Sequence, residues 1–191
     1  MNKQTKSLAK IVGDISDLTT FIASDEFLQV VNQEPPKQFI KEHPIAKGVK
    51  YVPIDKVEMM LTKIFQQWYV EVLREGQLLN AVYVTIRLHY RHPVTGEMNH
   101  QDGVGAMQIQ VDQGKNASDL GAIKSNAIML GLPAAKSYAI KDAAEHIGKV
   151  FGRDLNRKDT MAFVPSYATK QAKNINTRKK KEILEKLNAN T

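Results

Sequence analysis

The clearest pattern of hydrophobic and polar positions lies in residues 78–90. Apolar residues alternate strictly with smaller or more polar ones; the apolar set is Val82, Val84, Ile86, Leu88 and Tyr90, and the other set is Ala81, Tyr83, Thr85, Arg87 and His89. Successive side chains of a strand point to opposite faces, so this pattern predicts a β-strand with one buried face and one hydrated, partly basic face.

Two further strand-like runs flank this one, at residues 68–73 and from Met98 or Val104 to residue 111. Glu75-Gly76 predicts the tight connection between the first two strands, and residues 92–97, which hold a proline and a glycine, predict the second turn. The three runs are therefore expected to form an antiparallel β-meander.

A first helix is predicted from Pro53, with Asp55 and Glu58 as a capping-box-like pair at its start. Its apolar positions recur every three or four residues, as expected for one face seeking a core. They are Val57, Met60, Leu61, Ile64, Phe65 and Trp68.

After the strands, helical signals run over residues 117–130, are broken by Gly131-Leu132-Pro133, and resume over residues 134–151. The later stretch carries an apolar stripe at helical spacing and ends at Gly152, a residue that commonly terminates helices. The stripe is Ile140, Ala143, Ala144, Ile147, Val150 and Phe151. The order of elements predicts an α+β fold, an antiparallel β-meander with helices packed on one face.

Three regions are expected along the chain: residues 1–50, 51–158 and 159–191. The first holds a short amphipathic helix, with apolar residues between Leu8 and Leu18, and a proline-rich stretch from Asn32 that reads as an extended arm or a surface loop. The second is the α+β core, and the third is a basic, partly disordered tail with a short helix over residues 177–187.

Composition narrows the function classes. Of 191 residues, 42% are hydrophobic and 25% charged, which is ordinary for a globular protein. No apolar run approaches a membrane span, and the N-terminus lacks the apolar segment of a signal peptide, so no membrane association and a cytoplasmic location are expected. Without cysteine there is no disulfide, no thiolate nucleophile and no cysteine-bound zinc.

The net charge of +7 is unevenly distributed. Residues 1–152 carry 17 Lys and Arg against 16 Asp and Glu, whereas residues 153–191 carry 10 against 4. A basic tail behind a nearly neutral domain is typical of contact with a polyanion, because releasing counterions from phosphates drives binding without regard to sequence. A solvated tail that only aids solubility is the alternative.

Three short motifs carry a resemblance to a known family. They are Asp102-Gly103-Val104-Gly105, the helical segment from Lys136 to Lys141-Asp142-Ala143, and Phe151-Gly152 followed by Leu155-Asn156. Over residues 51–158 the chain resembles Rad-fifty-two-type single-strand annealing proteins, which include eukaryotic recombination mediators and shorter phage proteins. The resemblance implies rings or helical filaments that hold single-stranded nucleic acid in a basic groove between the meander and the helix ending in Phe-Gly.

Candidate nucleic-acid-binding residues follow from the predicted faces. The cations are Arg87, Arg91, Lys124, Lys136, Lys141, Lys149 and Arg153, and the rings that could stack on bases are Tyr83 and Tyr90, with Tyr69 and Trp68 as further candidates. A solvated helix face is the alternative for each lysine, and a core anchor for the tryptophan.

The resemblance places Lys149 at the family's basic position two before the Phe, and Asp142 at its acidic position. The family's Lys-Arg pair, which touches the strand backbone, aligns with Glu145-His146, so either the inner DNA site is weakened here or another group supplies that charge. Arg153 and the basic tail are the candidates.

An enzymatic interpretation rests on polar residues around one hairpin, namely His89, His92, Glu97, His100 and Asp102. A metal-dependent nuclease needs carboxylates that clamp two ions, and a second well-spaced pair is missing. No metal, no cofactor and no catalytic residue are therefore predicted.

The expected function is ATP-independent binding and annealing of single strands by a homo-oligomer, with single-stranded DNA and the annealed duplex as ligands. A single-strand-binding protein or an exonuclease is a candidate partner, and a phage-encoded protein would act in the bacterial host cytoplasm. The alternatives are a non-catalytic interaction protein with a basic tail and, less favoured, the metal-dependent nuclease.

Overall fold

The computed structural model describes residues 18–44, 46–116, 119–160 and 163. The chain divides into two compact units, residues 1–30 with 162–191, and residues 31–161. In the first unit the described element is helix α2, Leu18–Val31, in which Gln29 donates to Asp25 at 3.0 Å. The helices predicted near residues 8–18 and 177–187 fall almost wholly outside the described residues. None of the described helices has the length and apolar character that crossing a membrane requires.

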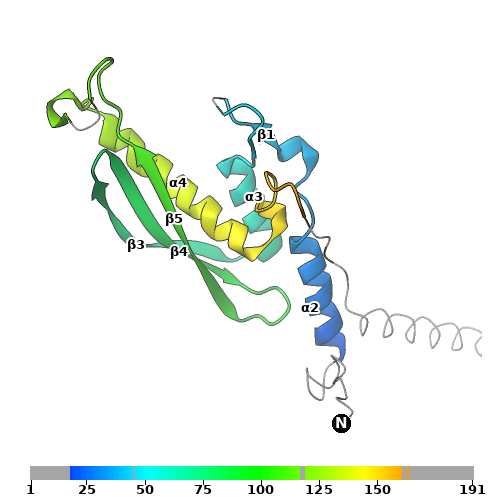
Figure 1. The fold of residues 1–191 in the computed structure, drawn as a ribbon. Coiled ribbons are helices and arrows are strands. Elements are labelled where there is room, and N and C mark those ends of the chain that lie inside the picture. Colours follow the sequence, from blue (N-terminus) through cyan, green and yellow to red (C-terminus); the bar gives the residue numbers. More distant parts are fainter. Residues whose placement is uncertain (1–17, 45, 117–118, 161–162, 164–191) are drawn as a thin grey trace, which may run out of the picture. The chain divides into compact units, whose positions relative to one another are not determined.

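Residues 31–161 form an α+β unit, and the predicted antiparallel meander is confirmed (Figure 1). Strands β3 (Trp68–Leu78), β4 (Ala81–Arg91) and β5 (Met98–Gln108) pair in the order β3-β4-β5, antiparallel throughout. The alternation along β4 is also confirmed, because all five of its apolar residues are buried and their neighbours are only half-buried.

The prediction of a turn at Glu75-Gly76 is wrong. Both residues lie inside β3, where Gly76 pairs with Tyr83 and the ladder continues to Leu78 opposite Ala81. The Tyr83 ring lies over Gly76, with its hydroxyl 2.9 Å from where a Cβ would stand. The second turn is confirmed, and His92 N donates to Glu97 O at 2.8 Å.

Helix α3 runs over Ile54–Phe65 and buries four of the predicted apolar positions, Val57, Met60, Leu61 and Phe65. The expected cap is wrong, since Pro53 occupies the N-cap position and makes no side-chain capping bond. Asp55 lies in the first turn, where its carboxylate pairs with Lys56 at 3.1 Å. Trp68 begins β3, and its indole N–H donates to Thr62 Oγ1 at 3.0 Å.

Helix α4 is a single helix over Ala127–Ile147 that continues through Pro133, so the predicted break at residues 131–133 is wrong. Small residues at every fourth position bury one face of it, from Ala127 through Gly131, Ala135 and Ala139 to Ala143. This packing against the sheet outweighs the missing proline hydrogen bond. The helix also ends earlier than predicted, and a 3-10 turn, η3 (Lys149–Phe151), follows Gly148.

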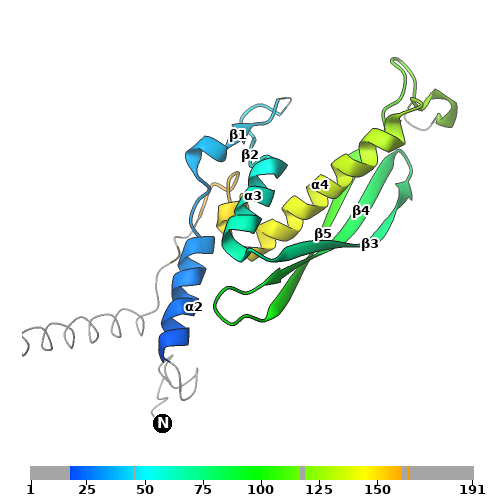
Figure 2. The same cartoon turned by 180° about the vertical axis from the view of Figure 1, so that it is seen from behind.

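Helix α4 lies along the face of the sheet that carries the apolar residues of β4 (Figures 1 and 2). At the end of α4, the residues 32–53 form a small arm with η1 (Lys37–Phe39), β1 (Lys41–Glu42) and β2 (Lys50–Tyr51). A second 3-10 turn, η2 (Leu120–Ala122), precedes α4. The hydrophobic pattern did not predict the two-stranded hairpin of β1 and β2.

The Gly103-Val104-Gly105 motif lets α4 approach β5 until backbone meets backbone. A Cβ on Gly103 would stand 2.6 Å from the amide nitrogen of Ala143, and one on Gly105 would fall on the carbonyl oxygen of Ala135. Between the glycines, Val104 N donates to the Asp142 carboxylate at 3.0 Å, which satisfies a donor on the outer edge of β5. Gly103, Gly105 and Asp142 thus act in packing, and they hold α4 against β5.

Candidate nucleic-acid interface

The Phe-Gly motif closes the core and turns the chain back toward the arm. Phe151 is fully buried, and Gly152 has a φ of 114°, a left-handed conformation that favours glycine. Four residues later Asn156 accepts from Lys50 N and donates to Lys50 O, each at 2.8 Å. We call residues 151–158 the Phe-Gly loop; this two-point contact ties it to β2 of the arm.

Asp154, in the middle of this loop, is surrounded by cations. Its carboxylate lies 3.0 Å from Lys149 Nζ, 3.4 Å from an Arg157 guanidinium nitrogen and 3.8 Å from Arg153 Nε. Lys149 donates to it and all three cations favour its charged form, so the pKa of Asp154 lies below its ordinary value. Both partners of the shortest pair are largely shielded from water, with side-chain exposures of 16% for Lys149 and 13% for Asp154.

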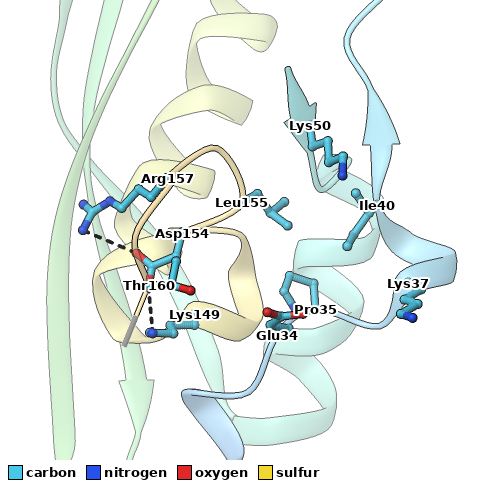
Figure 3. Close-up of a pocket in the computed structure, with 10 residues that line it drawn as sticks. All are labelled: Glu34, Pro35, Lys37, Ile40, Lys50, Lys149, Asp154, Leu155, Arg157 and Thr160. Carbon is cyan, nitrogen blue, oxygen red and sulfur yellow. Dashed lines mark ion pairs between the residues drawn. The ribbon is translucent and has the colours of Figure 1, made fainter. Parts of the chain in front are cut away.

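A pocket of about 460 Å³ lies between the Phe-Gly loop and the arm (Figure 3). One wall carries Lys149, Asp154 and Arg157, and the facing wall carries Lys37 and Lys50 from the arm. The remaining lining residues are Glu34, Pro35, Ile40, Leu155 and Thr160. We call this the basic pocket, because four of its lining side chains are cationic and two are acidic.

Two of the predicted cations have internal roles at this end of the molecule. Lys149 is held by Asp154, and Arg153 donates to Asn32 Oδ1 at 3.2 Å. Lys141, farther back on α4, points its ammonium at two rings, 4.8 Å from the centroid of Tyr51 and 5.8 Å from that of Tyr138. Burial lowers the pKa of Lys141, against an opposing effect of the nearby Glu145.

The pair Glu145-His146, where the family has Lys-Arg, adds no permanent positive charge. Glu145 is half-buried, and desolvation raises the pKa of its carboxyl. His146 is exposed and lines a shallow depression with His100, Gln101 and Asp102. The permanent cations that act on Glu145 are Lys141 of α4 and Arg153 of the Phe-Gly loop.

The opposite face of the sheet, which we call the open face, carries three of the other predicted residues, namely Arg87, Arg91 and Tyr83. Arg87 makes a two-point contact with Asp102, at 2.7 and 2.9 Å, which raises the pKa of Arg87 and lowers that of Asp102. Arg91 donates to Gly96 O at 3.0 Å and so holds the β4–β5 turn. Tyr83 covers Gly76.

A row of rings crosses the open face beside the Arg87 pair. Tyr69 of β3 stacks on His89 of β4 with centroids 4.5 Å apart and an interplanar angle of 11°, and His100 of β5 lies 6.0 Å farther on. Tyr69 is 55% exposed, so this end of the row of rings faces solvent. Tyr90 points to the other face; it is 6% exposed and packs on Phe65 at 4.5 Å, so it is a core residue.

The sheet thus separates the predicted site residues into two groups. Arg87, Arg91 and Tyr83 lie on the open face, and Lys141, Lys149 and Arg153 lie on the side of α4. Lys124 and Lys136 are exposed near and on the N-terminal half of α4.

Sequence reasoning missed the cations that complete the basic pocket, Lys37, Lys50 and Arg157. The first two stand in the proline-rich arm, where nothing in the local pattern indicates which element they will face. Asn156 belongs to the Phe-Gly motif of the family resemblance, and that membership is the one signal in the sequence for its clamp on Lys50.

The residues of the metal-dependent alternative do not form a metal site in the structure. Within the described part of the chain, no group of three or more His, Cys, Asp or Glu is placed to hold an ion. His89 instead contacts Glu71 at 3.0 Å, and His92 Nδ1 accepts from the turn amides of Val94 and Thr95.

No family model and no curated protein matches the chain, so comparison with known proteins does not indicate a function.

Proposed function

We propose that the protein binds single-stranded nucleic acid through its phosphate backbone and anneals complementary strands without ATP and without covalent chemistry. The strands would be single-stranded DNA, and the product is the annealed duplex. Duplex formation supplies the free energy, so the protein has only to hold backbones in place and leave bases free to pair.

The observation that carries the proposal is the concentration of positive charge at one end of residues 31–161. Residues 37–50 hold four lysines and one acidic residue, and residues 149–158 hold four Lys or Arg and one acidic residue. The rest of that unit holds 9 Lys and Arg against 12 Asp and Glu. The hydrogen bonds between Asn156 and Lys50 bring the two basic segments together, and such clusters bind phosphates irrespective of sequence.

Two further features support the proposal. The basic segment 149–158 leads directly into residues 159–191, which extend the positive charge along the chain. On the open face, the exposed Tyr69 ring and its stacked His89 offer a surface on which a base can stack. The three motifs of the family resemblance also converge on α4, with the two glycines of β5 against it and Phe151 behind its end.

By the same resemblance, the active form is a ring or helical filament of identical subunits in the cytoplasm, supplied with strands by an exonuclease or a single-strand-binding protein. Strand β3 pairs with β4 alone among the described residues, which leaves an edge available for contact with a second subunit.

The test follows annealing of two dye-labelled complementary oligonucleotides by energy transfer, in magnesium and without ATP. The full chain should accelerate annealing and leave both strands intact on a denaturing gel. Acceleration should fall steeply with salt, as it does when several phosphate contacts are made.

A pair of charge-matched variants locates the interface. Lys41→Glu with Lys47→Glu reverses two exposed charges on the arm, whereas Lys63→Glu with Lys115→Glu makes the same net change away from it. We expect the arm variant to slow annealing about tenfold or more at moderate salt and the second variant to act nearly as the unmodified chain. No acceleration by the unmodified chain, or equal losses in both variants, would refute the proposal; degraded strands would favour the nuclease.

A further inference from the structure

We propose that the basic pocket is a binding site for a phosphate monoester, the dianionic group found at the end of a nucleic-acid strand or on a mononucleotide. The proposal deepens the proposed function and rests on it for one point, that the phosphate belongs to a strand end. The geometry of the pocket itself is independent of annealing.

The first step is the imbalance of charge around Asp154. Lys149, Arg153 and Arg157 all lie within 4 Å of its carboxylate, and one carboxylate neutralises one of the three. The Lys149–Asp154 pair is largely shielded from water, whereas the other two cations are more accessible, with side-chain exposures of 32% for Arg153 and 65% for Arg157. An anion that enters beside Asp154 therefore meets two further positive charges in addition to those of the facing wall.

The second step is the facing wall. Lys37 and Lys50 add two cations across the pocket, and the backbone of Lys50 is held on both its N–H and its C=O by Asn156. Asn156 stands two residues after Asp154, so the two walls keep a fixed spacing. An anion can therefore bind without the cost of ordering the two backbones, and only the exposed side chains of Lys37 and Lys50 have to be ordered.

The third step is the choice of ligand. The lining has four cations and two carboxylates, a net charge of two positives, which matches a phosphate monoester of about −1.5 to −2 at neutral pH better than a singly charged phosphodiester or carboxylate. Arg157 turns its guanidinium toward Asp154 on the side away from the arm (Figure 3), so it adds positive charge behind this wall of the pocket, and the lysines act as point charges. The volume of about 460 Å³ lies within the range of small-ligand pockets, and Pro35, Ile40 and Leu155 provide apolar surface for a sugar.

The test compares one oligonucleotide in two forms, with a 5′-phosphate and with a 5′-hydroxyl, both carrying a dye at the 3′ end. Binding to the full chain is measured by fluorescence anisotropy at several salt concentrations. We expect the 5′-phosphate to tighten binding about tenfold, in keeping with charge-assisted hydrogen bonds that the hydroxyl cannot replace. A 3′-phosphate form with the dye moved to the 5′ end tells whether either strand end suffices.

Variants of the pocket should remove this advantage. Arg157→Gln and Lys50→Gln should bring the two forms to equal affinity, whereas Lys63→Gln, on the exposed side of α3, should keep the difference. Equal affinity for the two forms in the unmodified chain, with strand binding intact, would refute the assignment of the pocket to a strand end and leave the proposed function standing.

A second arm separates the pocket from strand binding. The melting temperature of the full chain is measured with deoxynucleoside monophosphate or inorganic phosphate, with the nucleoside as control. A rise with the phosphates that Arg157→Gln abolishes supports the pocket even if no strand is bound, in which case the proposed function alone fails. No rise in this arm together with no effect of the 5′-phosphate would overturn the pocket.

Discussion

Replacing Gly105 with alanine tests the close contact between β5 and α4. The new methyl group would fall on the carbonyl oxygen of Ala135 and lie 3.0 Å from the carbonyl carbon of Tyr138. These atoms belong to the helix backbone, so no side-chain rotation can relieve the clash. Either α4 moves away from the sheet or β5 twists, and both changes loosen the core beneath the helix.

The size of the effect follows from the atoms involved. Inserting a methylene into a packed core costs about 1–3 kcal/mol where neighbours can shift, and a clash with backbone belongs at the upper end, about 3 kcal/mol. For a folded unit of this size that corresponds to a fall in Tm of roughly 10 °C. In urea it corresponds to a midpoint lower by about 1–2 M.

The assay is equilibrium unfolding in urea, followed by the fluorescence of Trp68, the only tryptophan of the chain. Val104→Ala is the matched control, because it lies between the two glycines and its residue is 58% exposed. We expect the control to change stability by no more than about 0.5 kcal/mol. If Gly105→Ala were no more destabilised than Val104→Ala, the helix could not lie as close to the strand as we describe.

Three further outcomes are expected. Asn156→Ala should lower stability by about 0.5–1.5 kcal/mol in the same urea assay, because it removes two hydrogen bonds to the exposed backbone of Lys50; an unchanged midpoint would mean that the clamp is not formed in solution. Because the pKa of Asp154 is lowered in the folded state, its contribution to stability is present above the unfolded value near 3.8 and is lost as pH falls through the folded pKa; the gap between the unmodified chain and Asp154→Asn should therefore close in acid, and a gap independent of pH would contradict the ion pairs. Tyr90→Phe should leave strand affinity in the anisotropy assay unchanged, since its ring is buried, whereas Tyr69→Ala should weaken it several-fold; the reverse order would remove the open face from the interface.

The basic pocket lies near Glu145-His146, the pair that stands where the annealing proteins that the chain resembles have Lys-Arg. A half-buried carboxyl and an exposed imidazole cannot replace two permanent cations at that position. The Phe-Gly loop and the arm place Lys50, Lys149 and Arg157 around one pocket nearby. Contact with a strand would then centre on the end of α4 rather than on its middle.

The periodicity of the chain by itself determined the core of this fold. The strict alternation of β4 and the helical stripe of α3 reappear as buried faces, because each pattern matches the geometry of one element and needs a single apolar surface to pack against. The same reasoning predicted the order of strands and the turn at residues 92–97. For function the pattern was less informative. Tyr90 was a candidate for stacking on bases, yet its ring lies on the buried face of the sheet.

Only the tertiary structure decided where turns, helix ends and charges lie. Gly76 and Pro133 are both residues that often interrupt elements, yet the pairing of β3 with β4 and the packing of α4 on the sheet keep each of them inside one. The basic pocket depends on hydrogen bonds between Lys50 and Asn156, which are 106 positions apart. Local propensity acts over a few residues, whereas the pairing of charges and the meeting of two walls depend on how distant segments pack, and that information resides in the folded chain.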